Sequence, residues 1–217
     1  SRHEFNYSTR FRVIPGAHGV YRWGYQEIQS FESIEMVVSN NTMSFADYLR
    51  CIEFDLVVEC FYNNKFFDEF LGLLAFLGLP ISSYMDEIFA LRDQLPDSLG
   101  KIFSELVQAR QTELWDDRSE LIRHYESKSD ASSNISVNEH KASLATAKSV
   151  VVFKHLEELN SVAYQAMVNY LKNSGKDDEN LFKYLEEASI NSLMRNQRLL
   201  DTEVIKREMH FDFVNLE

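Results

Sequence analysis

The spacing of apolar positions along the chain predicts a mainly helical protein. Between residues 44 and 62, apolar side chains recur every three or four positions, which is typical of a helix with one buried face; these side chains are Phe45, Leu49, Ile52, Leu56 and Cys60. Comparable spacing predicts further helices, over residues 65–77, from 82 or 83 to before Pro96, over 97–128, over 141–173 and from 180 or 181 to 195. We therefore expect a helical bundle of five to six helices.

Two of these helices have clear end signals. Ser44 is a favourable N-cap, and Asp47 follows three residues later as a shortened capping box with Asp in place of Glu. Gly78 with Pro80 just beyond it is a strong stop signal, because glycine accepts the left-handed cap conformation and proline cannot continue a helix.

Two short stretches alternate between apolar and other residues, as strands do. Ile34, Met36 and Val38 alternate within residues 33–39, and a second alternation covers 204–214. Few other strand edges are predicted, and buried backbone groups need hydrogen-bond partners. We therefore expect these two stretches to pair as a small two-stranded β element.

The composition of the chain suggests one main domain with a distinct leading segment. Residues 1–33 contain Pro15-Gly16, which favours a turn, and three of the seven glycines, so we expect an irregular segment that joins a missing upstream domain. Residues 34–217 are expected to form a single helical domain. Within it, 127–140 contain five serines and are expected to be a flexible loop between two antiparallel helices.

Charge and hydropathy exclude several partners. The net charge of −12 opposes binding to phosphate backbones and anionic lipids, so no nucleic-acid partner is expected. The most apolar run, residues 70–81, is shorter than the roughly 20 residues of a membrane span, so no membrane partner is expected either. Two cysteines without a bridging framework, and no signal-peptide pattern at residue 1, favour a cytoplasmic location.

No motif for catalysis, metal binding or phosphate binding emerges. Cys51 and Cys60 are nine residues apart on one expected helix, so they face opposite ways and cannot share a metal. The chain has no Glu-x-x-His pair for a di-iron site, no nucleophile elbow and no phosphate-binding glycine loop. The sequence therefore offers no catalytic, cofactor-binding or metal-ligating residue.

One cluster of residues in the leading segment is unusual. Three aromatic residues and an arginine fall within five positions, 21–25, and such residues are enriched at buried contacts. They could contact another domain or a substrate, or pack on the core of this chain; both interpretations remain open. The candidate contact residues are Arg12, His18, Tyr21, Arg22, Trp23 and Tyr25.

Several segments resemble the C-terminal region of cobalamin-binding (B12-binding) radical S-adenosylmethionine enzymes. The stretch 9–15, Thr-Arg-Phe-Arg-Val-Ile-Pro, is similar to the place where the catalytic barrel of these enzymes ends. The stretch 41–51, Asn-Thr-Met-Ser-Phe-Ala-Asp-Tyr-Leu-Arg-Cys, is similar to the segment after that barrel, with 61–63, Phe-Tyr-Asn, beyond it. The ending 210–213, His-Phe-Asp-Phe, is similar to the strand that closes many such proteins.

The resemblance implies a function that lies partly outside this chain. The cobalamin-binding domain and the iron–sulfur barrel are missing, so this chain should bind no cofactor itself. The parent enzyme would carry a 4Fe-4S cluster and S-adenosylmethionine, with cobalamin as a further candidate. The expected partner is the upstream catalytic domain of the same polypeptide, with a substrate as the second candidate.

Three functional hypotheses follow. The first is an accessory domain of a radical S-adenosylmethionine enzyme that supports the barrel or recognises substrate, and that is not catalytic alone. The second is a stand-alone helical interaction or scaffold protein. The third is a small helical enzyme or ligand sensor, for which the sequence offers no convergent set of polar residues.

Overall fold

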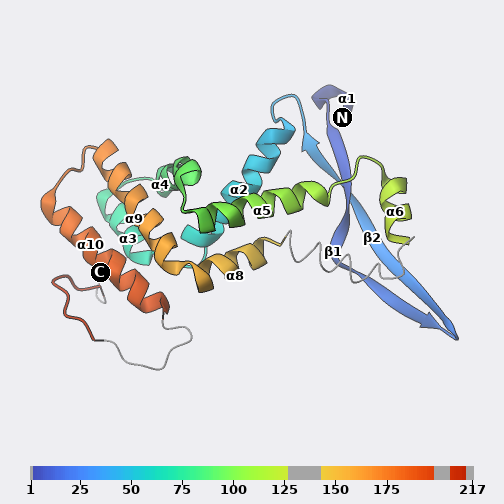
Figure 1. The fold of residues 1–217 in the computed structure, drawn as a ribbon. Helices are drawn as coiled ribbons and strands as arrows, with labels where there is room; N and C mark the ends of the chain where they lie inside the picture. Colours follow the sequence, from blue (N-terminus) through green and yellow to red (C-terminus); the bar gives the residue numbers. More distant parts are fainter. Residues whose placement is uncertain (1, 127–142, 198–205, 214–217) are drawn as a thin grey trace. The chain divides into compact units, whose positions relative to one another are not determined.

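The computed structural model describes residues 2–126, 143–197 and 206–213, and confirms a mainly helical protein with a small antiparallel sheet (Figure 1). These ranges contain nine α-helices, more than the five to six expected. In chain order the elements are α1 (Arg2–Phe5), β1 (Ser8–Trp23), β2 (Gln26–Ser39), α2 (Phe45–Phe61), α3 (Asp68–Leu77), α4 (Ile81–Ala90), the 3-10 helix η1 (Leu91–Gln94), α5 (Asp97–Thr112), α6 (Arg118–Glu126), α8 (Leu144–Lys154), α9 (Leu156–Asn173) and α10 (Glu179–Gln197).

The chain divides into two compact units. Unit 1 comprises Ser1–Glu53 and Phe103–Ala147, and unit 2 comprises Phe54–Ile102 and Lys148–Glu217. The division falls inside α2, α5 and α8, so each of these helices contributes residues to both units.

Unit 1 is built on a long antiparallel hairpin of β1 and β2. The pairing is interrupted between Val13 and His18, which divides the hairpin into an inner and an outer paired stretch, each with two strand segments. Gly16 lies in the interruption at φ 75° and Gly24 in the closing turn at φ 62°, and both values favour glycine.

The hairpin is covered by α6 on both sides of its interruption. Phe11, Val13 and Phe31 pack against the buried side chains of Leu121 and Tyr125. Next to this contact, the main chains of Phe11 and Trp115 exchange two hydrogen bonds of 2.7 Å, so the segment between α5 and α6 adds a short bridge to β1.

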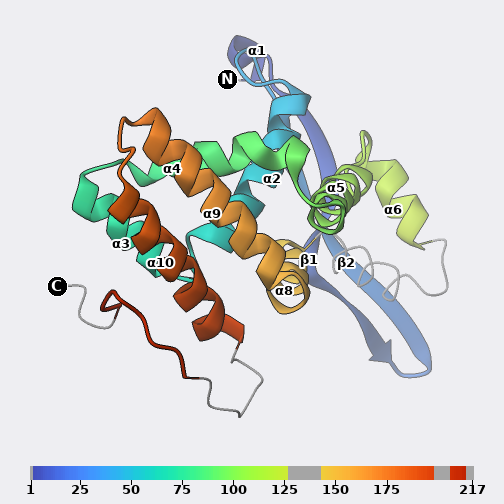
Figure 2. The same ribbon diagram turned by 60° about the vertical axis from the view of Figure 1, so that its left-hand side comes forward.

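Unit 2 is a helical core in which α9 packs against both α4 and α10, while α3 packs against α10 (Figure 2). Phe61, Phe67 and Phe70 form a continuous stack of buried rings, with centroids 5.6 and 5.8 Å apart. The buried hydroxyl of Tyr84 donates a 3.0 Å hydrogen bond to the carbonyl of Ala163, which ties α4 to α9.

The end signals read from the sequence are confirmed. The Ser44 Oγ accepts a 3.1 Å hydrogen bond from the Asp47 main chain, and the Asp47 carboxylate accepts one of 2.9 Å from the Ser44 main chain. Gly78 ends α3 at φ 67°, and the Leu79 N–H reaches back 2.9 Å to the Leu74 carbonyl. Both motifs form from residues close in sequence, which is why the sequence predicted them.

The expected β element is wrong in its partner and in its length. Residues 33–39 pair with β1, so the leading segment 1–33 is largely strand and not irregular. Of the stretch 204–214, the structure describes residues 206–213, and these form no strand. Phe211 and Phe213 instead contact the ring of Tyr184 on α10, at centroid distances of 5.2 and 5.3 Å.

The two long helices expected over 97–128 and 141–173 are each divided in two. The first ends at Thr112, because residues 113–117 leave the helical path to bridge β1, and α6 follows. The second is interrupted at His155, whose φ of −131° is not helical, between α8 and α9. The loop expected at 127–140 lies outside the described residues.

Candidate functional site

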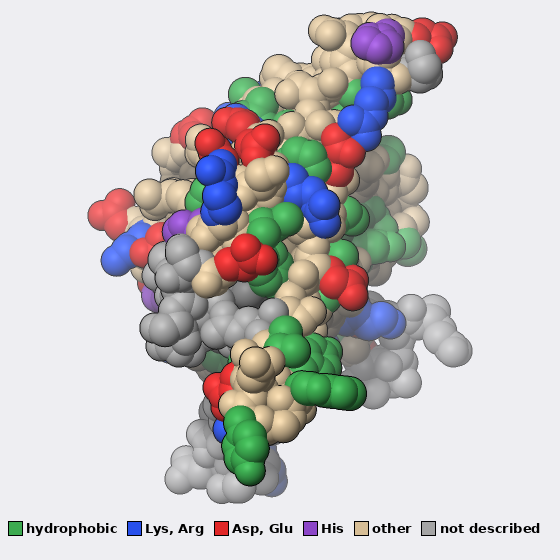
Figure 3. Space-filling view, turned by 90° about the vertical axis from the view of Figure 1, so that its right-hand side faces the viewer, with side chains coloured by type: hydrophobic (Ala, Val, Ile, Leu, Met, Phe, Trp, Pro, Cys, Tyr) green, Lys and Arg blue, Asp and Glu red, His purple; other side chains and the backbone are tan. Residues whose placement is uncertain are grey.

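The outer end of the hairpin carries the most exposed aromatic residues of unit 1. Cross-strand pairing sets Tyr21 opposite Ile28 and Trp23 opposite Gln26, so these four side chains share one face. Tyr21 is 65% exposed and Trp23 79%, while Tyr25 in the turn is fully exposed. On the side that Figure 3 shows, hydrophobic side chains gather at this outer end.

We name this surface the aromatic tip; it consists of Tyr21, Trp23, Tyr25 and Ile28. No charged residue belongs to its strand face, because Gln26 occupies the remaining position beside Trp23. An exposed surface that is apolar and uncharged is typical of a contact site for another molecule or domain.

Arg22, the charged residue of the predicted cluster, lies on the opposite face of the hairpin. Its Nη2 lies 2.8 Å from Glu27 Oε1 across the strands. Both side chains are well exposed, and ion pairs of this kind contribute little to stability. The pair neutralises Arg22 next to the aromatic tip, so the tip offers no strong attraction for an anion.

Arg12 is not part of the aromatic tip. It lies on the inner stretch of β1, where its Nη1 is 2.5 Å from Glu113 Oε1 and its side chain is only 15% exposed. The structure thus places Tyr21, Trp23 and Tyr25 at the outer end of the hairpin and Arg12 elsewhere. The backbone of His18 pairs with Phe31, and its side chain lies outside the described part of the structure.

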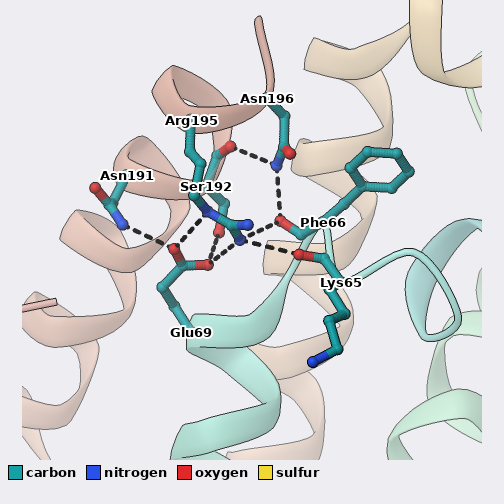
Figure 4. A network of polar contacts seen from close by, with 7 residues as sticks. All are labelled: Lys65, Phe66, Glu69, Asn191, Ser192, Arg195 and Asn196. Carbon is teal, nitrogen blue, oxygen red and sulfur yellow. Dashed lines mark hydrogen bonds and ion pairs between the residues drawn. The ribbon is translucent and has the colours of Figure 1, made fainter. Parts of the chain in front are cut away.

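Unit 2 contains a network of polar side chains around Glu69 that was not predicted from the sequence. The carboxylate of Glu69 is almost fully buried on α3 and accepts hydrogen bonds from three side chains of α10 (Figure 4). Asn191 Nδ2 lies 2.7 Å away, Ser192 Oγ 2.5 Å away, and Arg195 donates from Nε at 3.2 Å and from Nη2 at 3.1 Å. A signal was present in the sequence, since Glu69 lies on the apolar side of α3 beside Phe70.

The Glu69 network is structural in its chemistry. Arg195 also donates to the carbonyls of Lys65 and Phe66, and Asn196 donates to Phe66, so the polar groups are turned toward the start of α3. The carboxylate is saturated with donors, which leaves no basic lone pair directed at a ligand. The network joins α3 to α10 and offers no reactive group.

A cavity of about 290 Å³ lies where α8 meets α9. Glu158 at its edge accepts a hydrogen bond from Ser98, and its Oε2 lies 3.4 Å from Nδ1 of His155. Nucleophilic catalysis would need histidine between serine and carboxylate. Here the carboxylate holds the central place, so the arrangement does not activate Ser98.

Cofactor ligands are likewise not assembled by the described residues. No group of three or more His, Cys, Asp or Glu side chains in these ranges could hold a metal ion. Cys51 is exposed, whereas Cys60 is buried, and burial raises the pKa of its thiol to about 12. The two thiols therefore lie on different sides of α2, as their spacing predicted, and they do not fit the three-cysteine ligand set of a radical enzyme cluster.

Comparisons with known proteins assign no family and no function to this chain. No family model matches the chain, and no curated protein or solved structure matches it. Within the described ranges, no helix is both long enough and apolar enough to cross a membrane.

Proposed function

We propose that this chain is the C-terminal accessory domain of a B12-binding radical S-adenosylmethionine enzyme, and that the aromatic tip contacts the catalytic barrel or its substrate. The proposal rests on the resemblance of residues 9–15 and 41–51 to the segments that follow such a barrel. The observation that supports a contact role is the exposure of Trp23, Tyr21 and Tyr25 on one end of a long hairpin.

The energetics of the aromatic tip favour a partner within the same polypeptide. Burying the rings of Tyr21 and Trp23, at roughly 150 Å² each, would contribute about 7 kcal/mol. Association of two separate molecules costs about 4–15 kcal/mol in lost freedom, which is of the same size. A covalently joined domain avoids most of that cost through its high effective concentration.

In this proposal the chemistry belongs to the parent enzyme. Its 4Fe-4S cluster and S-adenosylmethionine, with cobalamin as a further candidate, would be held upstream. This chain would position the barrel or the substrate, would have no activity alone, and would work in the cytoplasm.

The proposal is tested first by the reading frame that encodes the chain. We expect several hundred further codons upstream of Ser1, including a Cys-x3-Cys-x2-Cys motif for a cluster. A reading frame without this motif would refute the enzyme assignment. Anaerobic incubation of the isolated chain with iron and sulfide should produce no stoichiometric cluster absorption.

The contact role is tested separately by hydrogen–deuterium exchange. We expect the amides of residues 20–28 to exchange more slowly in the long polypeptide than in the isolated chain. Trp23→Ala should remove that protection. Phe76→Ala provides a matched control, because Phe76 is 87% exposed but lies on α3 in unit 2. Equal exchange in both forms of the protein would exclude a buried tip.

A stand-alone interaction protein is the second candidate, and one observation favours it. The hairpin packs on α6 of its own chain through Phe11 and Val13 of the inner stretch and through Phe31 beyond the interruption, so the leading segment has a core of its own. A stand-alone protein would be encoded by a reading frame that starts near residue 1. It would also capture a separate protein through the aromatic tip, and Trp23→Ala would abolish that capture.

A further inference from the structure

The described C-terminal residues, 206–213, form an irregular segment that lies against α10 (Figure 2). Half-buried and exposed side chains alternate along its second half. The half-buried ones are Met209, Phe211 and Phe213, and the exposed ones are Glu208, His210 and Asp212. The alternation that predicted a strand over 204–214 therefore places apolar side chains on a helix and not in a sheet. We name residues 206–213 the terminal segment.

Glu187 on α10 binds the main chain of the terminal segment. Its Oε2 accepts hydrogen bonds from the successive N–H groups of His210 and Phe211, at 2.8 and 3.1 Å. Its Oε1 lies 2.6 Å from Nδ1 of His210. Successive N–H groups in a bent main chain form a concave site for an anion, and here the carboxylate fills it. Two of these three contacts involve main-chain atoms, so another residue with an N–H group could make them.

Tyr184 binds the side chains of the same segment. The ring centroids of Phe211 and Phe213 lie 5.2 and 5.3 Å from that of Tyr184, so both phenylalanines share one partner. Aromatic pairs at this separation are favourable beyond the area that they bury. Tyr184 precedes Glu187 by three positions and thus lies on the same side of α10. We name Tyr184 and Glu187 the α10 clamp.

The α10 clamp is carried by a well-anchored helix. Asn191, four residues after Glu187, lies on the same side of α10, and its Nδ2 donates a 2.7 Å hydrogen bond to Glu69 on α3. The Glu69 network therefore fixes this side of α10 before any ligand arrives. A preformed site loses less free energy to ordering when it binds.

The terminal segment, by contrast, is attached at the surface. His210 is 92% exposed, and the rings of Phe211 and Phe213 stay partly in contact with solvent. Eight residues, 198–205, connect the segment to the end of α10. A short tether gives an effective concentration on the order of millimolar, so a peptide of moderate affinity stays on the clamp while it is tethered. A free peptide with the same contacts would compete with it.

We propose that the α10 clamp is a docking site for a peptide segment of a partner protein that carries two aromatic residues separated by one position, and that Phe211 and Phe213 occupy this site until the partner displaces them. The chemistry of the occupant follows from the contacts: two rings bind Tyr184, and two successive N–H groups bind Glu187. A strongly acidic peptide is disfavoured, because the site contains a carboxylate and the chain carries a net charge of −12. The proposal is independent of the aromatic tip and of the accessory-domain assignment.

Fluorescence anisotropy with a labelled peptide tests the site. The probe has the sequence of residues 206–213, Lys-Arg-Glu-Met-His-Phe-Asp-Phe. The receptor is the full chain with Phe211→Ala and Phe213→Ala, which clears its own clamp. We expect saturable binding to this cleared chain and binding about tenfold weaker to the unchanged chain, where the tethered segment competes. A probe with alanine in place of both phenylalanines should not bind, and this control leaves the protein unaltered.

Variants of the cleared chain locate the site. Glu187→Gln should weaken peptide binding about tenfold, the effect of losing charge-assisted hydrogen bonds. Glu186→Gln is the matched control, because Glu186 is an exposed neighbour on α10 that points about 100° away around the helix and should leave the affinity unchanged.

Several results would overturn the proposal. They are no binding to the cleared chain, equal affinity of the cleared and unchanged chains, or equal affinity of Glu187→Gln and Glu186→Gln. Light scattering of the unchanged chain separates one further case. A mass that doubles with concentration, and does so only while Phe211 and Phe213 are present, would assign the terminal segment to a second copy of this chain and would also overturn the proposal.

Discussion

Replacing Glu69 with alanine should destabilise unit 2 strongly. The Glu69 side chain is 5% exposed and accepts four hydrogen bonds from Asn191, Ser192 and Arg195 on α10. The substitution removes the acceptor for all of them. Because α3 and α10 are far apart in sequence, these bonds form only in the folded state, where they help to hold the two helices together.

The magnitude follows from what each donor can do after the change. Four charge-assisted bonds at about 1.5–3 kcal/mol each would overestimate the loss. Arg195 is 41% exposed and keeps its bonds to the carbonyls of Lys65 and Phe66, whereas Ser192 is only 1% exposed and cannot turn to water. We therefore expect a loss of about 3 kcal/mol, the lower end for breaking a buried ion pair.

Urea unfolding followed by far-UV circular dichroism measures this loss. Helical signal is the suitable probe because both tryptophans, Trp23 and Trp115, lie in unit 1. Glu179→Ala is the matched control: Glu179 is 85% exposed on α10 and pairs with Lys183 at 2.8 Å, so its loss should cost about 0.5 kcal/mol or less. A cost for Glu69→Ala within about 1 kcal/mol of this control would refute the role of the network.

Three further outcomes are expected from single groups. In the native chain at mildly alkaline pH, maleimide should label the exposed Cys51 at once. Cys60 should be labelled only after denaturation, because it is buried and burial raises the pKa of its thiol to about 12. Mass spectrometry counts the labels, and two fast labels would contradict the buried position of Cys60. The hydrogen bond from Arg2 lowers the pKa of Glu35 from 4.5 to about 2. The contribution of this ion pair to stability should therefore be complete above pH 4.5 and lost as the pH falls toward 2. NMR titration of the Glu35 side chain checks this, and a titration midpoint near 4.5 would contradict it. Tyr84→Phe removes the buried hydroxyl that bonds to α9 and should lower the free energy of unfolding by about 1 kcal/mol; an unchanged urea midpoint would show that this bond is not stabilising.

The candidate contact residues were partly foreseeable. Tyr21, Trp23 and Tyr25 were singled out because three aromatic residues stood close together in a segment with no predicted core, and the structure leaves all three exposed. Arg12 belonged to the same list but is partly buried against Glu113, 101 residues away along the chain. No local pattern could indicate a pairing at that separation.

Local sequence determined where helices begin and end in several places. Ser44 with Asp47 and Gly78 with Leu79 satisfy backbone groups within a few residues, so neighbouring positions suffice to specify them. Apolar periodicity likewise identified the helical class, because it reports which face of a helix is buried.

Tertiary structure alone decided the pairing of strands and the division of the long helices. Periodicity names a buried face but not what covers it, so residues 33–39 were given the wrong partner and the hairpin with β1 was missed. The helix expected to continue through residue 113 stops because Trp115 gains two main-chain hydrogen bonds with Phe11. Such bonds join residues about a hundred positions apart, and their free energy is gained only after the chain has folded.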